Sequence, residues 1–364
     1  MRLFECQSCG NTLYFENTRC ERCGHGLGFL PAAGILSAVE PEEEGLRALA
    51  DGALYRACSN ATLGTCNWLV PIEEDGRFCR CCRHNRRAPN LDDPKVMKMW
   101  RTIEFSQHRL FVTLLRLNLP LPTREEDPEA GLVFDVLADP KDPKAPRVLT
   151  GHDKGLITFN LAEGDDAERE RRRVSMGEPY RTMLGHMRHE IAHFFWDRLV
   201  RDAGQGEVLY ACRQVFGDPS VDYAAALKTH YESGPPDNWQ EHYVSAYATS
   251  HPWEDFAETT AHYLHMVDTL ETAFAYGMRL RPNVGDSTDM ATRIDFDPHE
   301  EADFDRIIHA WLPLTFAMNS LNRSMGLSDL YPFLLSQPVI EKLRFIHGLL
   351  HPAASLPEAE SEAA

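Results

Sequence analysis

Apolar residues recur at helical spacing along much of the chain after residue 93. Asp93 followed by Pro94 is typical of a helix N-terminus, and the apolar face that follows predicts a helix to about Leu119. Ser175 and Glu178 have the spacing of a capping box, which predicts the start of a second helix. This second helix is expected over about 175–200. Further helices are predicted over about 218–234, 252–277, 299–324 and 337–350.

Two short apolar runs have the character of strands. They span Leu132–Leu137 and Leu156–Leu161, with a proline-rich loop between them. Together they predict a small twisted sheet beside the helices, so the expected fold class is α+β and mostly helical. The free edge of the second run is a candidate site for an extended peptide.

Composition places the chain among ordinary globular proteins. It has 364 residues, of which 43% are hydrophobic and 25% charged, which is enough for two or three domains. No apolar run approaches the roughly 18 residues of a membrane-spanning helix. The N-terminus also lacks the apolar stretch of a secretory signal, so we expect a cytoplasmic protein with reduced cysteines and no membrane partner.

Four cysteines near the N-terminus are spaced as a zinc ribbon. Two residues separate the members of each pair, and ten residues separate the pairs. Two such knuckles allow four thiolates to surround one zinc ion. The predicted ligands of this first structural zinc are Cys6, Cys9, Cys20 and Cys23.

A second group of cysteines is spaced less regularly. Its predicted zinc ligands are Cys58, Cys66, Cys79 and Cys82. Cys81 is adjacent and can replace a neighbour, although the knuckle spacing favours Cys79 with Cys82. Disulfide bonds are the alternative, which the expected reducing compartment disfavours. Both sets are closed four-thiolate sites, so we expect structural rather than catalytic zinc.

The charge distribution is uneven. The net charge is −18, which disfavours general binding to nucleic acid. Segment 77–101 nevertheless carries the basic residues Arg77, Arg80, Arg83, Arg86, Arg87, Lys95, Lys98 and Arg101. This basic segment is a candidate contact for a protein partner; a nucleic-acid partner is less favoured, and a merely solvated surface is equally compatible with the sequence.

The predicted helix over 175–200 contains the sequence His189-Glu190-Ile-Ala-His193. Residues four apart share one helix face, so His189 and His193 can present imidazole nitrogens to one metal ion. Glu190 then lies beside the metal, where it can accept a proton from water and return it to the leaving amine. Asp197, one turn further on, is either an outer-shell partner of a histidine or an ion-pair partner of an arginine.

A catalytic zinc needs a third protein ligand. Leu199 occupies the position that an extended His-x-x-Gly-x-x-His signature would require, so the ligand must come from elsewhere. Glu254 and Glu258 lie one turn apart on a later predicted helix. One of them can bind the metal while the other orients a ligating imidazole.

These motifs resemble those of the bacterial zinc-binding metallopeptidase family, gluzincin-like proteins that carry zinc ribbons before a His-Glu-x-x-His domain. The resemblance covers about residues 1–350 and is carried by Cys20-Glu-Arg-Cys-Gly-His25, Cys66-Asn-Trp-Leu-Val-Pro71, Gly155-Leu-Ile-Thr-Phe-Asn160, Met176-Gly-Glu-Pro-Tyr180, Gly185-His-Met-Arg-His-Glu-Ile-Ala-His193, Trp196-Asp-Arg-Leu199 and His251-Pro-Trp-Glu-Asp-Phe-Ala-Glu258. It implies zinc-dependent hydrolysis of peptide bonds and names no substrate.

The resemblance also implies roles for single residues. In gluzincins of the lethal-factor type, the first acid of a Glu-x-x-x-Glu helix binds zinc and the second lies in the outer shell, which assigns Glu254 as ligand and Glu258 as its supporting residue. A tyrosine seven residues before the ligand assists at the oxyanion, and Tyr247 has that spacing. Tyr243, His242 and His251 are competitors for a role in the site.

The sequence therefore predicts a zinc ribbon over 1–35, a second zinc module over 36–92, a zincin-like metallopeptidase domain over 93–351 and a disordered acidic tail over 352–364. The predicted function is that of a metallopeptidase with one catalytic and two structural zinc ions and a peptide or protein substrate. An alternative is a zinc-ribbon adaptor for protein or nucleic acid whose His-Glu-x-x-His zinc is structural. A third is a metal-dependent amidase acting on a non-protein amide.

Overall fold

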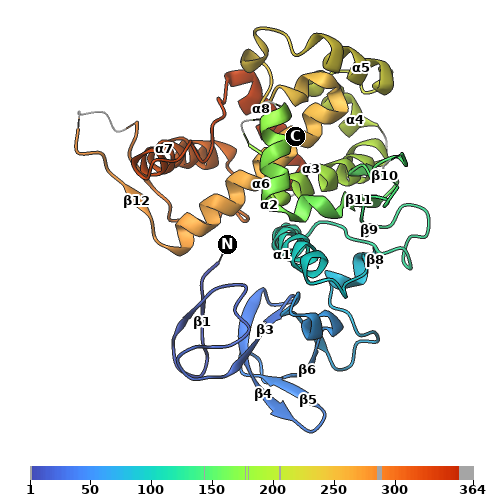
Figure 1. Cartoon of the computed structure of the whole chain (residues 1–364). Helices are drawn as coiled ribbons and strands as arrows, with labels where there is room; N and C mark the ends of the chain where they lie inside the picture. Colours follow the sequence, from blue (N-terminus) through green and yellow to red (C-terminus); the bar gives the residue numbers. More distant parts are fainter. Residues whose placement is uncertain are drawn as a thin grey trace, which may run out of the picture. The chain divides into compact units, whose positions relative to one another are not determined.

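The computed structural model describes residues 2–142, 144–176, 178, 180–204, 206–284 and 289–351. The expected acidic tail over 352–364 lies outside the described residues. The chain divides into two compact units, Met1–Phe194 and Phe195–Ala364, with the boundary inside a helix. Figure 1 shows the order of the elements along the chain.

The N-terminal part of the first unit is built from antiparallel strands. A short hairpin of β1 (Phe4–Glu5) and β2 (Thr12–Leu13) precedes a five-stranded sheet in simple sequence order. The strands of this sheet are β3 (Gly26–Leu30), β4 (Ile35–Glu42), β5 (Gly45–Ala48), β6 (Leu54–Ala57) and β7 (Leu69–Pro71). Because β3 pairs with β4 from Gly26↔Val39 to Leu30↔Ile35, one sheet includes residues from both expected zinc modules.

Aromatic packing forms the core beside this sheet. The rings of Phe29 and Trp68 lie 4.9 Å apart, and Phe15 packs edge-on against Phe29 at 5.1 Å. Gly28 permits the close approach of β7, because a Cβ atom at this position would overlap the side chain of Leu69. The fully buried Trp68 packs against Phe29 and, edge-on at 6.5 Å, against Phe15, so aromatic residues from distant parts of the chain share one core.

A second sheet of the first unit packs with a long helix. Its strands are β8 (Asn85–Arg87), β9 (Val133–Leu137), β10 (Gly151–Asp153) and β11 (Leu156–Asn160), and its order is β10-β11-β9-β8. Helix α1 (Pro94–Arg116) buries Phe111 against Phe134 of β9, with ring centroids 6.0 Å apart. Asp93 accepts a hydrogen bond from the Lys95 amide at 2.8 Å, as the predicted N-terminus requires.

The two predicted strands are confirmed as β9 and β11. The three-residue strands β8 and β10 were not predicted, because neither is long enough to show an alternating pattern. The prediction that β11 offers a free edge is wrong. β11 lies between β10 and β9, so the edges of this sheet are β10 and β8.

The predicted helix over 175–200 has a different N-terminus. Ser175 lies in the last turn of α2 (Asp166–Met176), where its hydroxyl donates to the Arg172 carbonyl at 2.9 Å, so the capping-box prediction is wrong. Helix α3 (Met183–Trp196) begins after Thr182, whose hydroxyl accepts a hydrogen bond from the Gly185 amide at 3.0 Å. A turn of π-helix over Asp197–Arg201 continues α3 close to the predicted end.

The second unit is mostly helical. Its long helices are α4 (Glu207–Phe216), α5 (Tyr223–Ser233), α6 (Pro252–Ala275), α7 (Phe304–Ser324) and α8 (Gln337–Leu350), and β12 (Arg279–Leu280) pairs with β13 (Thr292–Arg293). Helix α6 is the most buried and contacts α4, α7 and α8. A charged pair inside this unit joins Asp255 of α6 to Lys342 of α8, with Oδ2 and Nζ 2.6 Å apart.

The predicted helices of this unit differ from the structure at three places, one of which is the helix expected from about 299, which begins at Phe304. The helix expected from Asp218 begins at Tyr223, with Asp222 as its N-cap, while the Asp218 carboxylate accepts from the Ser220 amide. Helix α4 was not predicted, because it begins after Gly206, which offers no capping side chain. Among the described residues, no helix is both long enough and apolar enough to cross a membrane.

Gly164 is required where α1 passes the turn Leu161–Gly164. A Cβ atom at this position would overlap the backbone carbonyl of Met99, which cannot move without shifting α1. Gly164→Ala should therefore lower the free energy of unfolding by about 1–3 kcal/mol, as overpacking typically does. Urea unfolding of the zinc-loaded protein measures this change.

Gly348→Ala in α8 is the matched control. Open space surrounds the position, and alanine is favoured over glycine within a helix by about 1 kcal/mol. This variant should be as stable as the wild type or more stable. Equal effects of the two substitutions would contradict the proposed close packing at Gly164.

Candidate metal centres and candidate active site

The first cysteine set (Cys6, Cys9, Cys20 and Cys23) forms a compact group at the β1–β2 hairpin and the loop before β3. Two pairs of sulfur atoms, Cys6 with Cys23 and Cys9 with Cys20, lie 3.6 Å apart. Each knuckle turn ends at a glycine in the left-handed region, with φ +69° at Gly10 and +81° at Gly24. The turn therefore closes without the strain that a side chain would cause there.

The second cysteine set (Cys58, Cys66, Cys79 and Cys82) is fully buried. Backbone amides point at its sulfur atoms: the Cys79 amide lies 3.4 Å from Cys58 Sγ and the Trp68 amide 3.3 Å from Cys66 Sγ. The Cys82 amide makes the equivalent contact to Cys79 Sγ at 3.4 Å, which is the knuckle that the spacing predicted. Such amide contacts stabilise thiolates.

Cys81 lies outside this second set. It is completely buried, and burial raises the pKa of its thiol to about 12, so it remains a neutral thiol near pH 7. The group that does reach the second set is His108 of α1, whose Nε2 lies 3.5 Å from Cys82 Sγ. Nδ1 of His108 is held by the Glu104 carbonyl at 2.7 Å, so the imidazole connects the second cysteine set to α1.

Both sets fit zinc by the chemistry of their donors. Within each set, the four sulfur atoms all lie within 4.8 Å of one another. All ten cysteines of the chain are free thiols, so no disulfide bond competes with metal binding. Four thiolates with no open position suit a structural zinc ion.

Helix α3 brings two histidines together in the first unit. Nε2 of His189 and Nε2 of His193 lie 3.1 Å apart, with their rings nearly perpendicular. Two ligands about 2.1 Å from one zinc ion are separated by roughly this distance. The predicted pair therefore converges, and Glu190 is partly exposed on the turn between the two histidines. The ring of His152 on β10 lies parallel to that of His193 at 6.3 Å.

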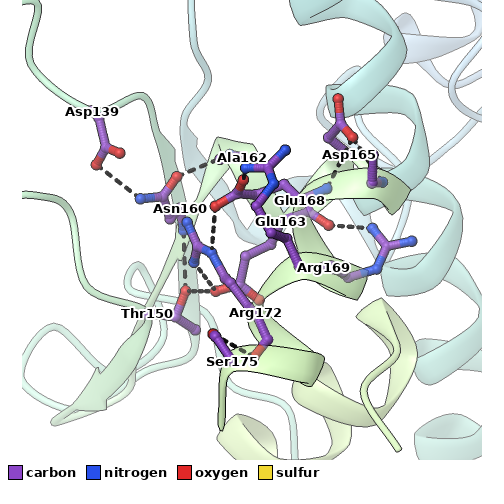
Figure 2. Close-up of polar contacts among 12 residues, drawn as sticks. Asp139, Thr150, Asn160, Ala162, Glu163, Asp165, Glu168, Arg169, Arg172 and Ser175 are labelled. Atoms are coloured by element: carbon purple, nitrogen blue, oxygen red, sulfur yellow. Dashed lines mark hydrogen bonds and ion pairs between the residues drawn. The ribbon is translucent and has the colours of Figure 1, made fainter.

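A buried carboxylate supports the start of this helix. Figure 2 shows Glu163, in the turn between β11 and α2, together with Thr150, Asn160 and Arg172. Glu163 accepts hydrogen bonds from the Thr150 hydroxyl and from Nδ1 of His186, each at 2.5 Å. Burial alone would raise the pKa of Glu163, but the hydrogen bond and positive charge of His186 lower it to about 2.

The second unit holds the two predicted acidic residues at the start of α6. Glu254 is buried, and its Oε1 accepts a hydrogen bond from the Tyr223 hydroxyl at 2.6 Å. Glu258 accepts from the Ser245 hydroxyl at 2.6 Å. Both carboxylates are thus oriented by hydroxyl groups from the segments that precede α6.

Tyr247 lies in the short turn Tyr247–Ser250, before α6. Burial raises the pKa of its phenol, and the negative charge of Glu254 raises it further, so the group stays protonated and can donate a hydrogen bond. Its competitor His251 has a structural role. The Nδ1 atom of His251 caps α6 by accepting from the Trp253 amide, and its Nε2 contacts the Val221 carbonyl at 3.0 Å.

The other residues that the sequence singled out make the following contacts. The ring of Tyr243 receives the Lys342 ammonium group 4.2 Å from its centroid, and the His242 carbonyl accepts from the same ammonium group at 2.7 Å. Asp197 forms an ion pair with Arg201 at 2.6 Å, which is one of the two roles that its position predicts. The basic segment is partly engaged as well, because Arg86 makes two hydrogen bonds to the buried Asp135.

Comparison with known proteins agrees with this arrangement of motifs. Residues 96–349 match the family model described as "putative zinc-binding metallo-peptidase", and residues 3–93 match a zinc-ribbon domain. The chain belongs to this metallopeptidase family. The resemblance recognised from the motifs is thereby confirmed, as is the α+β fold class.

Curated relatives of this metallopeptidase family member have no described activity. Uncharacterized proteins from Mycobacterium bovis and from two strains of Mycobacterium tuberculosis are each 42% identical over 360 residues, covering 97% of this chain and 96% of each relative. The similarity to these relatives therefore extends over both regions that the two family models match. No solved structure matches the chain.

Sequence reasoning missed three polar residues near the candidate site residues. Tyr223 contacts Glu254 across 31 positions, and Glu163 contacts His186 across 23. His152 lies on β10, which was not predicted. One indirect signal is present in the sequence: His186, the residue that Glu163 contacts, lies one turn before His189 on the same polar helix face.

The contrast between Cys81 and Cys82 tests whether the second cysteine set holds a zinc ion. Cys82→Ser should reduce the zinc content by about one ion per chain and destabilise the ribbon, because one of four thiolate ligands is lost. Cys81→Ser should leave the zinc content unchanged. Plasma mass spectrometry of the dialysed proteins gives both values, and a loss of zinc in the Cys81 variant alone would exchange the two assignments.

Proposed function

We propose that this chain is a zinc-dependent peptidase that hydrolyses peptide bonds. The observation that carries the proposal is the 3.1 Å separation of the Nε2 atoms of His189 and His193 in the His-Glu-x-x-His helix. This separation suits two ligands of one metal ion, and membership of the metallopeptidase family supports the same reaction class. Glu190, which a purely structural zinc site does not need, supports turnover rather than structure alone.

Glu254 is the proposed third ligand. Together with His189 and His193 it supplies two imidazole nitrogens and one carboxylate oxygen, a donor set that is typical of catalytic zinc. Its contact with the Tyr223 hydroxyl would fix the carboxylate without occupying both oxygens. Glu258 is the proposed outer-shell residue, and Asp197 is a second candidate for that role.

A zinc ion held by these residues would supply a Lewis acid that polarises the scissile carbonyl and lowers the pKa of water. Glu190 accepts the proton of the attacking water and passes it to the leaving amine. Tyr247, whose phenol stays protonated, donates a hydrogen bond to the oxygen that gains negative charge. An extended substrate would pair with the free edge of β10.

The zinc ribbons are proposed to be a recognition module for a protein partner or a protein substrate. Arg80 and Arg83 of the basic segment remain available for such a contact, whereas Arg86 and Arg87 are both paired with Asp135. This observation also favours the second candidate function, a ribbon-based adaptor without turnover. Nucleic acid is the less favoured partner, because a net charge of −18 opposes a polyanion. Ten free cysteines support a reducing compartment, which we propose is the cytoplasm.

The substitution Glu190→Gln separates the enzyme from the adaptor. It removes a proton acceptor but no metal ligand, so hydrolysis of a peptide library should be lost while zinc content stays constant. Cleavage products are identified by mass spectrometry. If the variant cleaves peptides as fast as the wild type, Glu190 is not the base; if neither protein cleaves any peptide or other amide, the adaptor function is favoured.

The two acidic residues of α6 should respond differently to alanine. We expect about three zinc ions per wild-type chain, and Glu254→Ala should lose the catalytic one because a ligand is removed. Glu258→Ala should keep three ions and lose about 10- to 100-fold in metal affinity or activity, the usual scale for outer-shell residues. Zinc analysis and competition with a chelator measure both, and the reverse pattern would exchange the two roles.

A further inference from the structure

His186 shares a helix face with the proposed zinc ligands. It precedes His189 by one turn of α3 and His193 by two, so the three side chains lie along one stripe. The side chain of His186 is 23% exposed, and His189 and Glu190 on the same stripe are also partly exposed. In contrast, Met187 and Ile191 on the opposite side are completely buried.

The contact with Glu163 fixes the orientation of this imidazole. The Glu163 side chain is 2% exposed and is ionised above a pKa of about 2, so it can only accept hydrogen bonds. Nδ1 of His186 must therefore carry the proton in the 2.5 Å hydrogen bond. Nε2 lies on the other side of the ring and makes no hydrogen bond within the described part of the chain.

Glu163 is itself held from several sides. The Thr150 hydroxyl binds Oε1, the Arg172 guanidinium lies 3.8 Å from the same oxygen, and Gly164 follows in the tight turn against α1. Figure 2 shows Thr150 and Arg172 beside the Glu163 carboxylate. A desolvated carboxylate is costly unless it is paired, so this arrangement keeps a charged acceptor behind His186.

We propose that His186, oriented by Glu163, is a substrate-binding residue whose Nε2 forms a hydrogen bond with the backbone of a bound peptide beside the reacting bond. The inference rests on the proposed peptidase function and adds a residue to it. His186 binds the peptide backbone rather than the metal. Glu163 is a positioning residue, because it acts only through the imidazole.

Two substitutions at His186 separate the roles of its nitrogen atoms. His186→Asn keeps an amide nitrogen near the position of Nδ1, so it retains the contact with Glu163 and loses Nε2. His186→Gln places its amide nitrogen near the position of Nε2 instead. Glu163→Gln removes the charge that orients the ring, and Glu170→Gln on α2 is the matched control, since the exposed Glu170 pairs only with Arg173 in the described contacts.

The experiment measures binding of two kinds of hydroxamate to each zinc-loaded full-length protein by calorimetry. Acetohydroxamate binds the catalytic zinc alone, whereas dipeptide hydroxamates with varied side chains also offer a peptide backbone. His186→Asn should weaken dipeptide hydroxamate binding about threefold to tenfold, the usual effect of one hydrogen bond, and leave acetohydroxamate binding unchanged. His186→Gln should stay within about threefold of the wild type, and Glu163→Gln should lie between the two.

Kinetics provides the second readout. With peptides that the wild type cleaves, His186→Asn should raise KM more than it lowers kcat, because the contact is present before and during the reaction. Equal behaviour of the Asn and Gln variants, or unchanged dipeptide hydroxamate affinity in His186→Asn, would overturn the inference. If acetohydroxamate does not bind the wild type, the proposed zinc site and the peptidase function fail, and the inference fails with them.

Discussion

Eight cysteine thiols gathered in two tight groups are the constraint on which the N-terminal part of this protein depends. Four sulfur atoms within 4.8 Å of one another cannot all carry charge unless a cation lies among them. The strands around them are short, and the apolar packing there includes the Phe29–Trp68 pair and a small cluster of Leu30, Val39, Ala48 and Leu69. Metal binding is therefore part of the folding free energy of this region. Helix α1 depends on it too, because His108 contacts Cys82.

Helix α3 carries polar side chains that are held by hydrogen-bonding partners. The helix is apolar on one side, where Ile191 and Phe194 are buried, and carries imidazoles and a carboxylate on the other. Glu163 stabilises the first turn of this polar face through His186. Glu254 and Glu258 are oriented in their own unit by Tyr223 and Ser245. Glu163, Glu254 and Glu258 thus each have a hydrogen-bonding partner that limits the rotation of the carboxylate.

The sequence predicted those features that depend on residues close together in the chain. Helix α6 follows from Pro252 and its apolar periodicity, and the two cysteine sets follow from knuckle spacing. Helix α2 was not recognised, because it is held by ion pairs such as Arg172 with Glu168 rather than by an apolar face.

Contacts between distant segments had no local signal. Nothing in the sequence around Tyr223 or Glu254 indicates that the tyrosine donates a hydrogen bond to this glutamate. The interior position of β11 could not be predicted either, because it depends on the three-residue strand β10. Fold class was therefore accessible from periodicity, while the orientation of the site residues required tertiary structure.

The pairing of β3 with β4 limits where this chain can be cut and fused to another protein. Five residue pairs join the two strands across residue 35, where a module boundary would otherwise be drawn. A gene fusion with its junction there would leave β4 without its neighbour and would expose Phe29 and Leu30, which are buried in the intact sheet. The two cysteine sets can accordingly be exchanged between proteins only as one inherited block, with a junction that lies beyond Cys82.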